Sequence, residues 1–206
     1  MPDFRFEREI VSQGYRAIAG LDEAGRGALF GPVVAASIMF SLSLIKGETK
    51  AWLEEIDDSK RISPTKREML ARKILIHSDA VGIGMASSAE IDRKNIYWAS
   101  FEAMKRACLN MPKVPDFLLV DGFRLNDVNY PQMFLPKGDQ KSISIAAASI
   151  IAKVTRDQIM RSLDLVFEGY ALSKNKGYGT KEHYDALRRL GPTAFHRQSY
   201  NLEGKK

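Results

Sequence analysis

Two adjacent acids and a glycine-arginine-glycine loop are the residues of this chain best suited to chemistry. Asp22 and Glu23 follow an apolar stretch that predicts a strand, and Gly25, Arg26 and Gly27 come next. Neighbouring side chains of a strand point to opposite faces, so both acids reach one site only if the strand ends at Asp22 and the chain turns. Carboxylates suit hard divalent cations, and an arginine between bare glycines suits a bulky anion. The run predicts a metal and phosphate site; its alternative is a pair of solvated acids beside a tight turn.

Two further acids follow a predicted strand or lie on a tight loop. Asp121 comes directly after the apolar run 117–120, and Asp139 lies in the loop 137–139. Sites in open α/β sheets assemble at the ends of central strands. Four acids gathered there can hold two divalent ions about 3.5–4 Å apart, one to activate a water and one to stabilise the leaving 3′ oxygen. We therefore expect Asp22, Glu23, Asp121 and Asp139 to form one catalytic metal site.

Asp157 competes with Asp139 for the fourth position. It lies inside a predicted long helix, with Lys153 four residues before it and Arg161 four residues after it. These are the spacings of ion pairs on a helix. We therefore interpret Asp157 as structural and Asp139 as the ligand.

The composition predicts one globular domain of ordinary size. The chain has 206 residues, of which 45% are hydrophobic and 27% charged. No apolar run approaches the roughly 20 residues of a membrane span, and the start lacks the basic and apolar regions of a signal peptide. The single Cys108 allows no internal disulfide and is expected in a helix core. We expect a cytoplasmic monomer with no membrane partner.

The charge is unevenly distributed along the chain. The net charge is +6, and residues 137–206 hold 13 basic against 7 acidic side chains, whereas residues 1–136 are balanced. This asymmetry predicts a polyanion bound mainly by the last third of the protein; a basic face that serves solubility is the alternative. The candidate phosphate contacts are Lys60, Lys174, Lys176, Lys181, Arg188, Arg189 and Arg197.

The order of predicted elements indicates an α/β fold. Strands are expected up to Asp22 and at 32–40, 80–87, 117–120 and 132–135, and a polar loop at 57–61. Helices are expected at 64–77, around 97–111, and at 144–168 and 181–190. This order favours a mixed β-sheet flanked by helices. We expect residues 1–170 to form the catalytic domain and residues 171–206 a small helical extension that contributes to substrate binding.

Six motifs in order resemble ribonuclease HII, the bacterial type 2 ribonuclease H family. They are AGLDEAGRG at 19–27, DSK at 58–60, VDG at 120–122, KGD at 137–139, AAASIIAKVTRD at 146–157 and GYGT at 177–180. The resemblance, which runs from about Arg16 to Tyr200, implies a ribonuclease H-like fold and Mn²⁺ or Mg²⁺ as cofactor. It also implies an endonuclease that hydrolyses the RNA strand of RNA·DNA hybrids and cuts 5′ of single ribonucleotides in duplex DNA. The products would carry a 3′-hydroxyl and a 5′-phosphate.

The same resemblance assigns roles to individual residues. The four catalytic acids of the family match Asp22, Glu23, Asp121 and Asp139. The loop Gly25-Arg26-Gly27 would contact the 2′-OH of the ribonucleotide, which a closely approaching backbone can test by hydrogen bonding. Tyr178 would contact the nucleotide that follows.

The basic region also contains two histidines, His183 and His196. Both lack metal-ligand spacing with the acids, so we leave them out of the catalytic set.

Two other classes of function compete with this one. A non-catalytic protein that binds RNA or RNA·DNA hybrids needs only the basic C-terminal third, but acids without a catalytic use would repel the polyanion. A different metal-dependent phosphotransferase of the same fold, such as a junction resolvase or integrase, has no use for a glycine-arginine-glycine loop paired with Tyr178. The set of acids and the glycine-arginine-glycine loop with Tyr178 therefore favour the ribonuclease.

Overall fold

The computed structural model describes the chain apart from residues 48–49, 57–58, 60–61, 127 and 205–206. Its strands are β1 (Ile18–Ala24), β2 (Val33–Phe40), β3 (Ser78–Ala86), β4 (Phe117–Asp121) and β5 (Gln132–Leu135). Its helices are α1 (Arg5–Ser12), α2 (Leu42–Lys46), α3 (Pro64–His77), α4 (Ser88–Lys94), α5 (Ile96–Leu109), the 3₁₀ helix η1 (Gly138–Gln140), α6 (Ile143–Asp164), α7 (Leu172–Asn175) and α8 (Lys181–Leu190).

The five strands form one mixed sheet in the order β3-β2-β1-β4-β5. The chain reverses direction from β1 to β2 and from β2 to β3, so these pairs are antiparallel, whereas β1 pairs with β4, and β4 with β5, in parallel. Leu21 lies opposite Val120 across the parallel pair. The residues that follow them, Asp22 and Asp121, therefore emerge side by side at the same edge of the sheet.

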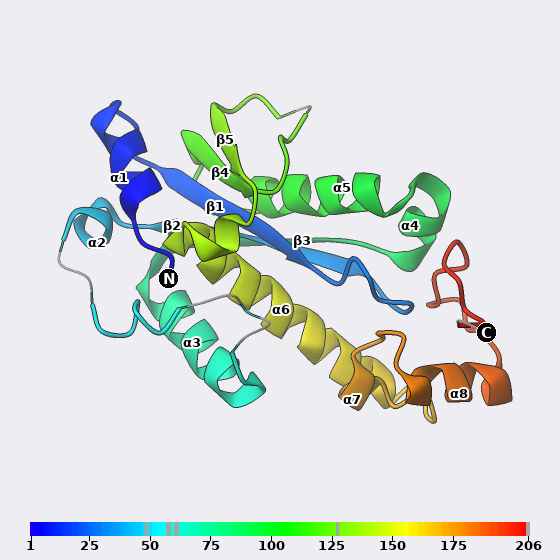
Figure 1. The fold of residues 1–206 in the computed structure, drawn as a ribbon. Coiled ribbons are helices and arrows are strands. Elements are labelled where there is room, and N and C mark those ends of the chain that lie inside the picture. The colour runs from blue at the N-terminus through cyan, green and yellow to red at the C-terminus, as the bar shows by residue number, and fades with distance from the viewer. Residues whose placement is uncertain (48–49, 57–58, 60–61, 127, 205–206) are drawn as a thin grey trace.

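Helices cover both faces of the sheet. In Figure 1, α3 and α6 lie on one face and α4 and α5 on the other. Helix α6 approaches β1 closely because Gly20 has no side chain: a Cβ there would lie 2.2 Å from the backbone carbon of Ser144. The Ser142 hydroxyl caps the helix by accepting the N–H of Ile145. This close packing brings the first two turns of α6, with Ser149, beside the strand that carries Asp22.

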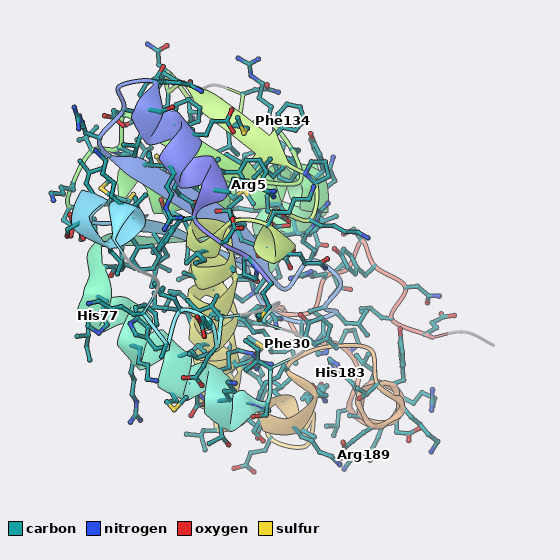
Figure 2. All side chains as sticks on the ribbon, turned by 60° about the vertical axis from the view of Figure 1, so that its left-hand side comes forward. Arg5, Phe30, His77, Phe134, His183 and Arg189 are labelled. Carbon is teal, nitrogen blue, oxygen red and sulfur yellow. The ribbon has the colours of Figure 1, made fainter. Side chains whose placement is uncertain are left out.

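The C-terminal elements pack on the connection between β1 and β2. A hydrophobic cluster joins that connection to α6, α7 and α8, and its buried members are Leu29, Phe30, Met160, Tyr170, Leu172, Ala186 and Leu187. Figure 2 shows Phe30 facing His183 of α8 while Arg189 projects outward; the two rings have centroids 6.5 Å apart. The division into residues 1–170 and 171–206 stays a prediction.

The mixed α/β sheet and its main helices confirm the predicted fold, and several local predictions were wrong. Strand β1 does not end at Asp22 but runs to Ala24, because Asp22 and Glu23 still pair with Ala36 and Ala35 of β2. Both acids nevertheless line one pocket, so the condition that the strand must end at Asp22 was wrong. Helices α1, α2, α4 and α7 and the 3₁₀ helix η1 were not predicted, and α6 ends at Asp164 rather than 168. Among the described residues, no helix is long and apolar enough to cross a membrane.

Candidate active site

The four predicted acids line one pocket at the carboxyl ends of β1 and β4. The pocket has a volume of about 320 Å³. Oδ1 of Asp121, the last residue of β4, accepts a 2.6 Å hydrogen bond from the N–H of Gly138. This bond holds η1, which carries Asp139, against the end of β4. Acids from three separate places in the sequence thus become neighbours because β1 and β4 run in parallel.

Asp22 and Glu23 are carboxyls withdrawn from water. Asp22 is 6% exposed, and its Oδ1 accepts the N–H of Glu23 at 2.7 Å. Burial, followed by the charges of Glu23 and Asp121, raises the pKa of Asp22 well above its usual value. Burial also raises the pKa of Glu23, against the opposing effect of Arg26, whose Nη1 lies 3.2 Å from Oε1. The pocket gathers negative charge that a bound cation would stabilise.

The donor set of the pocket fits a divalent cation. Glu23 Oε2 is buried and accepts no hydrogen bond, which leaves an acceptor that an ion can satisfy. Carboxylate oxygens are the ligands that Mg²⁺ and Mn²⁺ prefer. Among the described residues, however, no group of three or more acidic, histidine or cysteine side chains is already arranged so that it could hold an ion.

The two glycines of the loop serve different purposes. Gly25 has φ +100°, and a Cβ there would lie 2.1 Å from Nε of Arg156. The space that a side chain would occupy is filled by the buried Arg156, although Gly25 also lines the pocket. Gly27 faces open space, and a Cβ at this position would have no neighbouring atom within 4 Å. Of the two glycines, Gly27 is thus the one whose Cβ position is open to an approaching molecule, and Arg26 between them is exposed.

Tyr178 lies beside this loop and lines the same pocket. An isolated β-bridge joins it to Ala28. Its ring stands 5.3 Å from Nζ of Lys153 and 5.2 Å from Cζ of Arg156, so two cations support its face. The ring is half-buried. The structure therefore brings Tyr178 together with the loop and the acids, as predicted from the sequence.

Three further side chains line the pocket and were not singled out from the sequence. They are Ser59, Ser149 and Lys153. The hydroxyls of Ser59 and Ser149 lie 2.9 Å apart, and a hydrogen bond from Ser149 to Asp22 opposes the rise in the pKa of that carboxyl. The available signal was that all three lie inside motifs shared with the family.

Asp157 does not line the pocket and is engaged in ion pairs. Its Oδ1 lies 2.6 Å from Nζ of Lys153, and its Oδ2 lies 3.7 Å from Nη1 of Arg67. The predicted partner Arg161 instead pairs with Glu68 at 2.9 Å. The structure thus agrees with a structural role for Asp157, although one of its two partners was wrong.

The candidate phosphate contacts have different outcomes. Arg197 is fully buried, so the prediction that it contacts phosphate was wrong. Lys60 lies outside the described residues. The other candidates lie on the surface or partly so: Lys174, Lys176, Lys181, Arg188 and Arg189. His183 and His196 are buried together with their Nε2 atoms 3.2 Å apart, away from the acids, which agrees with leaving both out of the catalytic set.

Known proteins of one class share this architecture. The structure matches ribonuclease H2 from Pyrococcus horikoshii with a TM-score of 0.73 and 24% identity, covering 91% of this chain and 95% of that one. It matches Bst-RNase HIII in complex with Mn²⁺ with a TM-score of 0.65 and 18% identity, covering 92% and 68%. These likenesses show a ribonuclease H-like fold.

The sequence carries the assignment further. The family model of ribonuclease HII matches residues 19–203. The ribonuclease HII of Geobacillus kaustophilus is 48% identical over 196 residues, which cover 95% of this chain and 72% of that protein. The chain belongs to the ribonuclease HII family. It is a metal-dependent ribonuclease, a hydrolase that cleaves the RNA strand of RNA·DNA hybrids, and the resemblance found in the sequence is confirmed.

Proposed function

We propose that this ribonuclease cuts on the 5′ side of single ribonucleotides embedded in duplex DNA, as well as within RNA·DNA hybrids. The products would carry a 3′-hydroxyl and a 5′-phosphate. The observation that supports this proposal is one pocket that combines the four acids with Gly25, Arg26, Gly27 and Tyr178. A site for phosphodiester hydrolysis and a surface for recognising a ribonucleotide would thus be contiguous.

Asp22, Glu23, Asp121 and Asp139 are the proposed catalytic residues and the proposed ligands of two Mn²⁺ or Mg²⁺ ions. Such ions, when bound, supply an activated water and stabilisation of the leaving 3′ oxygen. The donors are all oxygens, which suits either ion, and the related Bst-RNase HIII is known in complex with Mn²⁺. Burial, followed by repulsion from Glu23 and Asp121, raises the pKa of Asp22, and a bound cation would offset this repulsion. Arg26 holds Glu23 through its 3.2 Å ion pair.

Substrate recognition would fall to the loop and Tyr178. The exposed backbone at Gly27 can approach a ribose closely enough to hydrogen-bond its 2′-OH, the group that distinguishes RNA from DNA. Tyr178 presents a half-buried ring to the next nucleotide. Lys60 and the exposed cations of residues 171–206 would contact phosphates without regard to sequence. We propose this C-terminal segment as a substrate-binding extension of the catalytic domain 1–170, in a cytoplasmic monomer.

Cleavage of an end-labelled DNA duplex with one ribonucleotide tests the proposal. We expect one cut 5′ of the ribonucleotide with added Mn²⁺ or Mg²⁺, none in EDTA and none in the all-DNA duplex. Asp22→Asn and Asp121→Asn should abolish cleavage and leave duplex binding largely intact. Equal cleavage of the all-DNA duplex would refute ribonucleotide specificity.

Asp79→Asn is the matched control for these two variants. Asp79 pairs with Lys113 at 2.9 Å near the start of β3, at the opposite end of the sheet from the pocket. Its removal also deletes one negative charge, so it controls for net charge. Cleavage by Asp79→Asn should stay at the wild-type rate. A comparable loss in all three variants would mean that net charge, and not the pocket, matters.

A further inference from the structure

Arg197 is a buried cation bound to backbone carbonyls of the substrate loop. Its Nη1 donates to the carbonyl oxygen of Arg26 at 2.8 Å, and its Nη2 donates to that of Gly25 at 2.8 Å. Nε and Nη2 also donate to the carbonyl of Gly31, at 3.1 and 3.0 Å. Burial lowers the pKa of Arg197 to about 10, so the side chain remains a cation at neutral pH. Within the described part of the chain, no acid forms an ion pair with it.

Tyr200 holds the same loop from the same segment. Its hydroxyl donates to the carbonyl oxygen of Arg26 at 2.7 Å, and its ring lies 5.2 Å from Cζ of Arg197. The backbone N–H of Arg197 donates to Leu29 at 2.8 Å. Figure 1 shows this C-terminal segment running beside the tip of the β1–β2 connection. Residues 196–200 thus support a loop that lies about 170 residues earlier in the sequence.

The direction of these bonds fixes which loop groups face outward. In a planar trans peptide, the N–H of one residue points opposite to the carbonyl of the residue before it. Because the carbonyls of Gly25 and Arg26 point to Arg197, the N–H groups of Arg26 and Gly27 point away from it. No acceptor for either N–H is found among the described residues. Two oriented donors are therefore left for a molecule in the pocket.

We propose that Arg197, assisted by Tyr200, is a positioning residue for ribonucleotide discrimination: it holds two loop carbonyls so that the N–H groups of Arg26 and Gly27 face the ribose. This inference rests on the proposed function, since it assumes that the loop senses the 2′-OH. A lysine cannot replace Arg197, because one ammonium lacks the planar fork that reaches three carbonyls.

The test compares binding to a duplex with one ribonucleotide against binding to the matching all-DNA duplex, in EDTA so that no cleavage occurs. The affinity ratio reports discrimination, whereas a merely structural role would weaken both affinities alike. We expect Arg197→Lys to lower the ratio by about tenfold, the worth of one or two lost hydrogen bonds. The salt dependence of all-DNA binding should not change, because Arg197 contacts no phosphate.

Arg106→Lys is the control for the loss of a guanidinium. Arg106 also donates to a backbone carbonyl, that of Met85 at 2.7 Å, but it lies between β3, α4 and α5, outside the pocket. The affinity ratio of Arg106→Lys between the two duplexes should equal that of the wild type. If Arg197→Lys is folded by circular dichroism and keeps the wild-type ratio, or loses affinity for both duplexes equally, the inference is overturned.

Tyr200→Phe provides a second test that does not depend on Arg197→Lys folding. It keeps the ring and removes only the hydroxyl, and we expect a two- to fivefold smaller ratio, roughly one neutral hydrogen bond. Tyr170→Phe is its control, because that hydroxyl donates to the carbonyl of Gly191 at 2.6 Å in the same C-terminal cluster. If Arg197→Lys does not fold, an unchanged ratio in Tyr200→Phe overturns the inference. A wild type that binds both duplexes alike in EDTA overturns the inference, whereas a wild type that cleaves both duplexes alike with added Mn²⁺ or Mg²⁺ refutes the proposed function itself.

Discussion

Alanine in place of each loop glycine should separate fold stability from substrate approach. At Gly25 the alanine would meet two penalties, a φ of +100° and a Cβ placed 2.1 Å from Nε of Arg156. At Gly27 it would meet neither, since that position faces open space. We therefore expect Gly25→Ala to destabilise the protein and Gly27→Ala to leave its stability unchanged while weakening substrate binding.

The magnitudes follow from these two penalties. A strained backbone conformation costs about 1–3 kcal/mol, and forcing an extra carbon into a packed site costs about 1–3 kcal/mol. Gly25→Ala should therefore lose roughly 2–6 kcal/mol, a fall in melting temperature of about 5–20 °C for a domain of this size. Gly27→Ala should stay within about 0.5 kcal/mol of the wild type. A methyl group held against the ribose should weaken ribonucleotide binding by roughly 1–3 kcal/mol.

Thermal unfolding of the variants and duplex binding in EDTA measure both effects. Gly14→Ala is a control for backbone strain alone, because Gly14 has φ +104° and a Cβ there would have nothing within 4 Å. It should lose about 1–3 kcal/mol, less than Gly25→Ala. The reasoning is refuted if Gly27→Ala is destabilised as much as Gly25→Ala, or if Gly25→Ala is no less stable than Gly14→Ala.

Two further predictions concern charge and pH. The pKa of Asp22 is higher in the folded protein than the 3.8 of the unfolded chain, so its carboxylate destabilises the metal-free fold increasingly as the pH rises from 3.8 through the raised pKa. Asp22→Asn should therefore unfold at a higher temperature than the wild type at pH 7 in EDTA. A lower unfolding temperature would contradict this. Burial, and then the charge of His183, lowers the pKa of His196 from 6.5 to about 4. The stability that neutral His196 contributes should therefore be fully present above pH 6.5 and decline progressively toward pH 4. Urea unfolding across that range should show a weaker decline in His196→Asn, and an identical decline in both proteins would contradict the assignment.

Periodicity and local signals predicted the main elements well. The small residues before Lys153 indicated a helix close to a sheet, and Gly20 allows that approach because a Cβ there would lie only 2.2 Å from the backbone of α6. Helix α1 was missed because its support is not local. Its buried Glu7 accepts hydrogen bonds from the Ser142 hydroxyl at 2.6 Å and the N–H of Ser144 at 3.0 Å, 135 and 137 residues away. The apolar residues of this short helix do follow a helical period, but the local sequence shows nothing of the distant partners that hold it.

In the candidate site, too, residue types were evident from the sequence, whereas their arrangement depends on distant parts of the chain. The types of Asp22, Glu23, Asp121 and Asp139 suggested metal chemistry, because carboxylate chemistry belongs to the residues themselves. That they share a pocket depends on the parallel register of β1 with β4, in which Leu21 lies opposite Val120. Register across a sheet is set by long-range packing, which the order of residues does not fix.

The charge of Arg197 is evident in the sequence, and it suggested a phosphate contact. Only the tertiary structure shows that this arginine is buried beneath the loop of Gly25 and Arg26 and bound to their carbonyls. The sequence by itself determined the family, the acids and the glycine-arginine-glycine loop, because these depend on residue type and local order. The tertiary structure decided which face each side chain presents, because burial and hydrogen bonding are settled by partners far away along the chain.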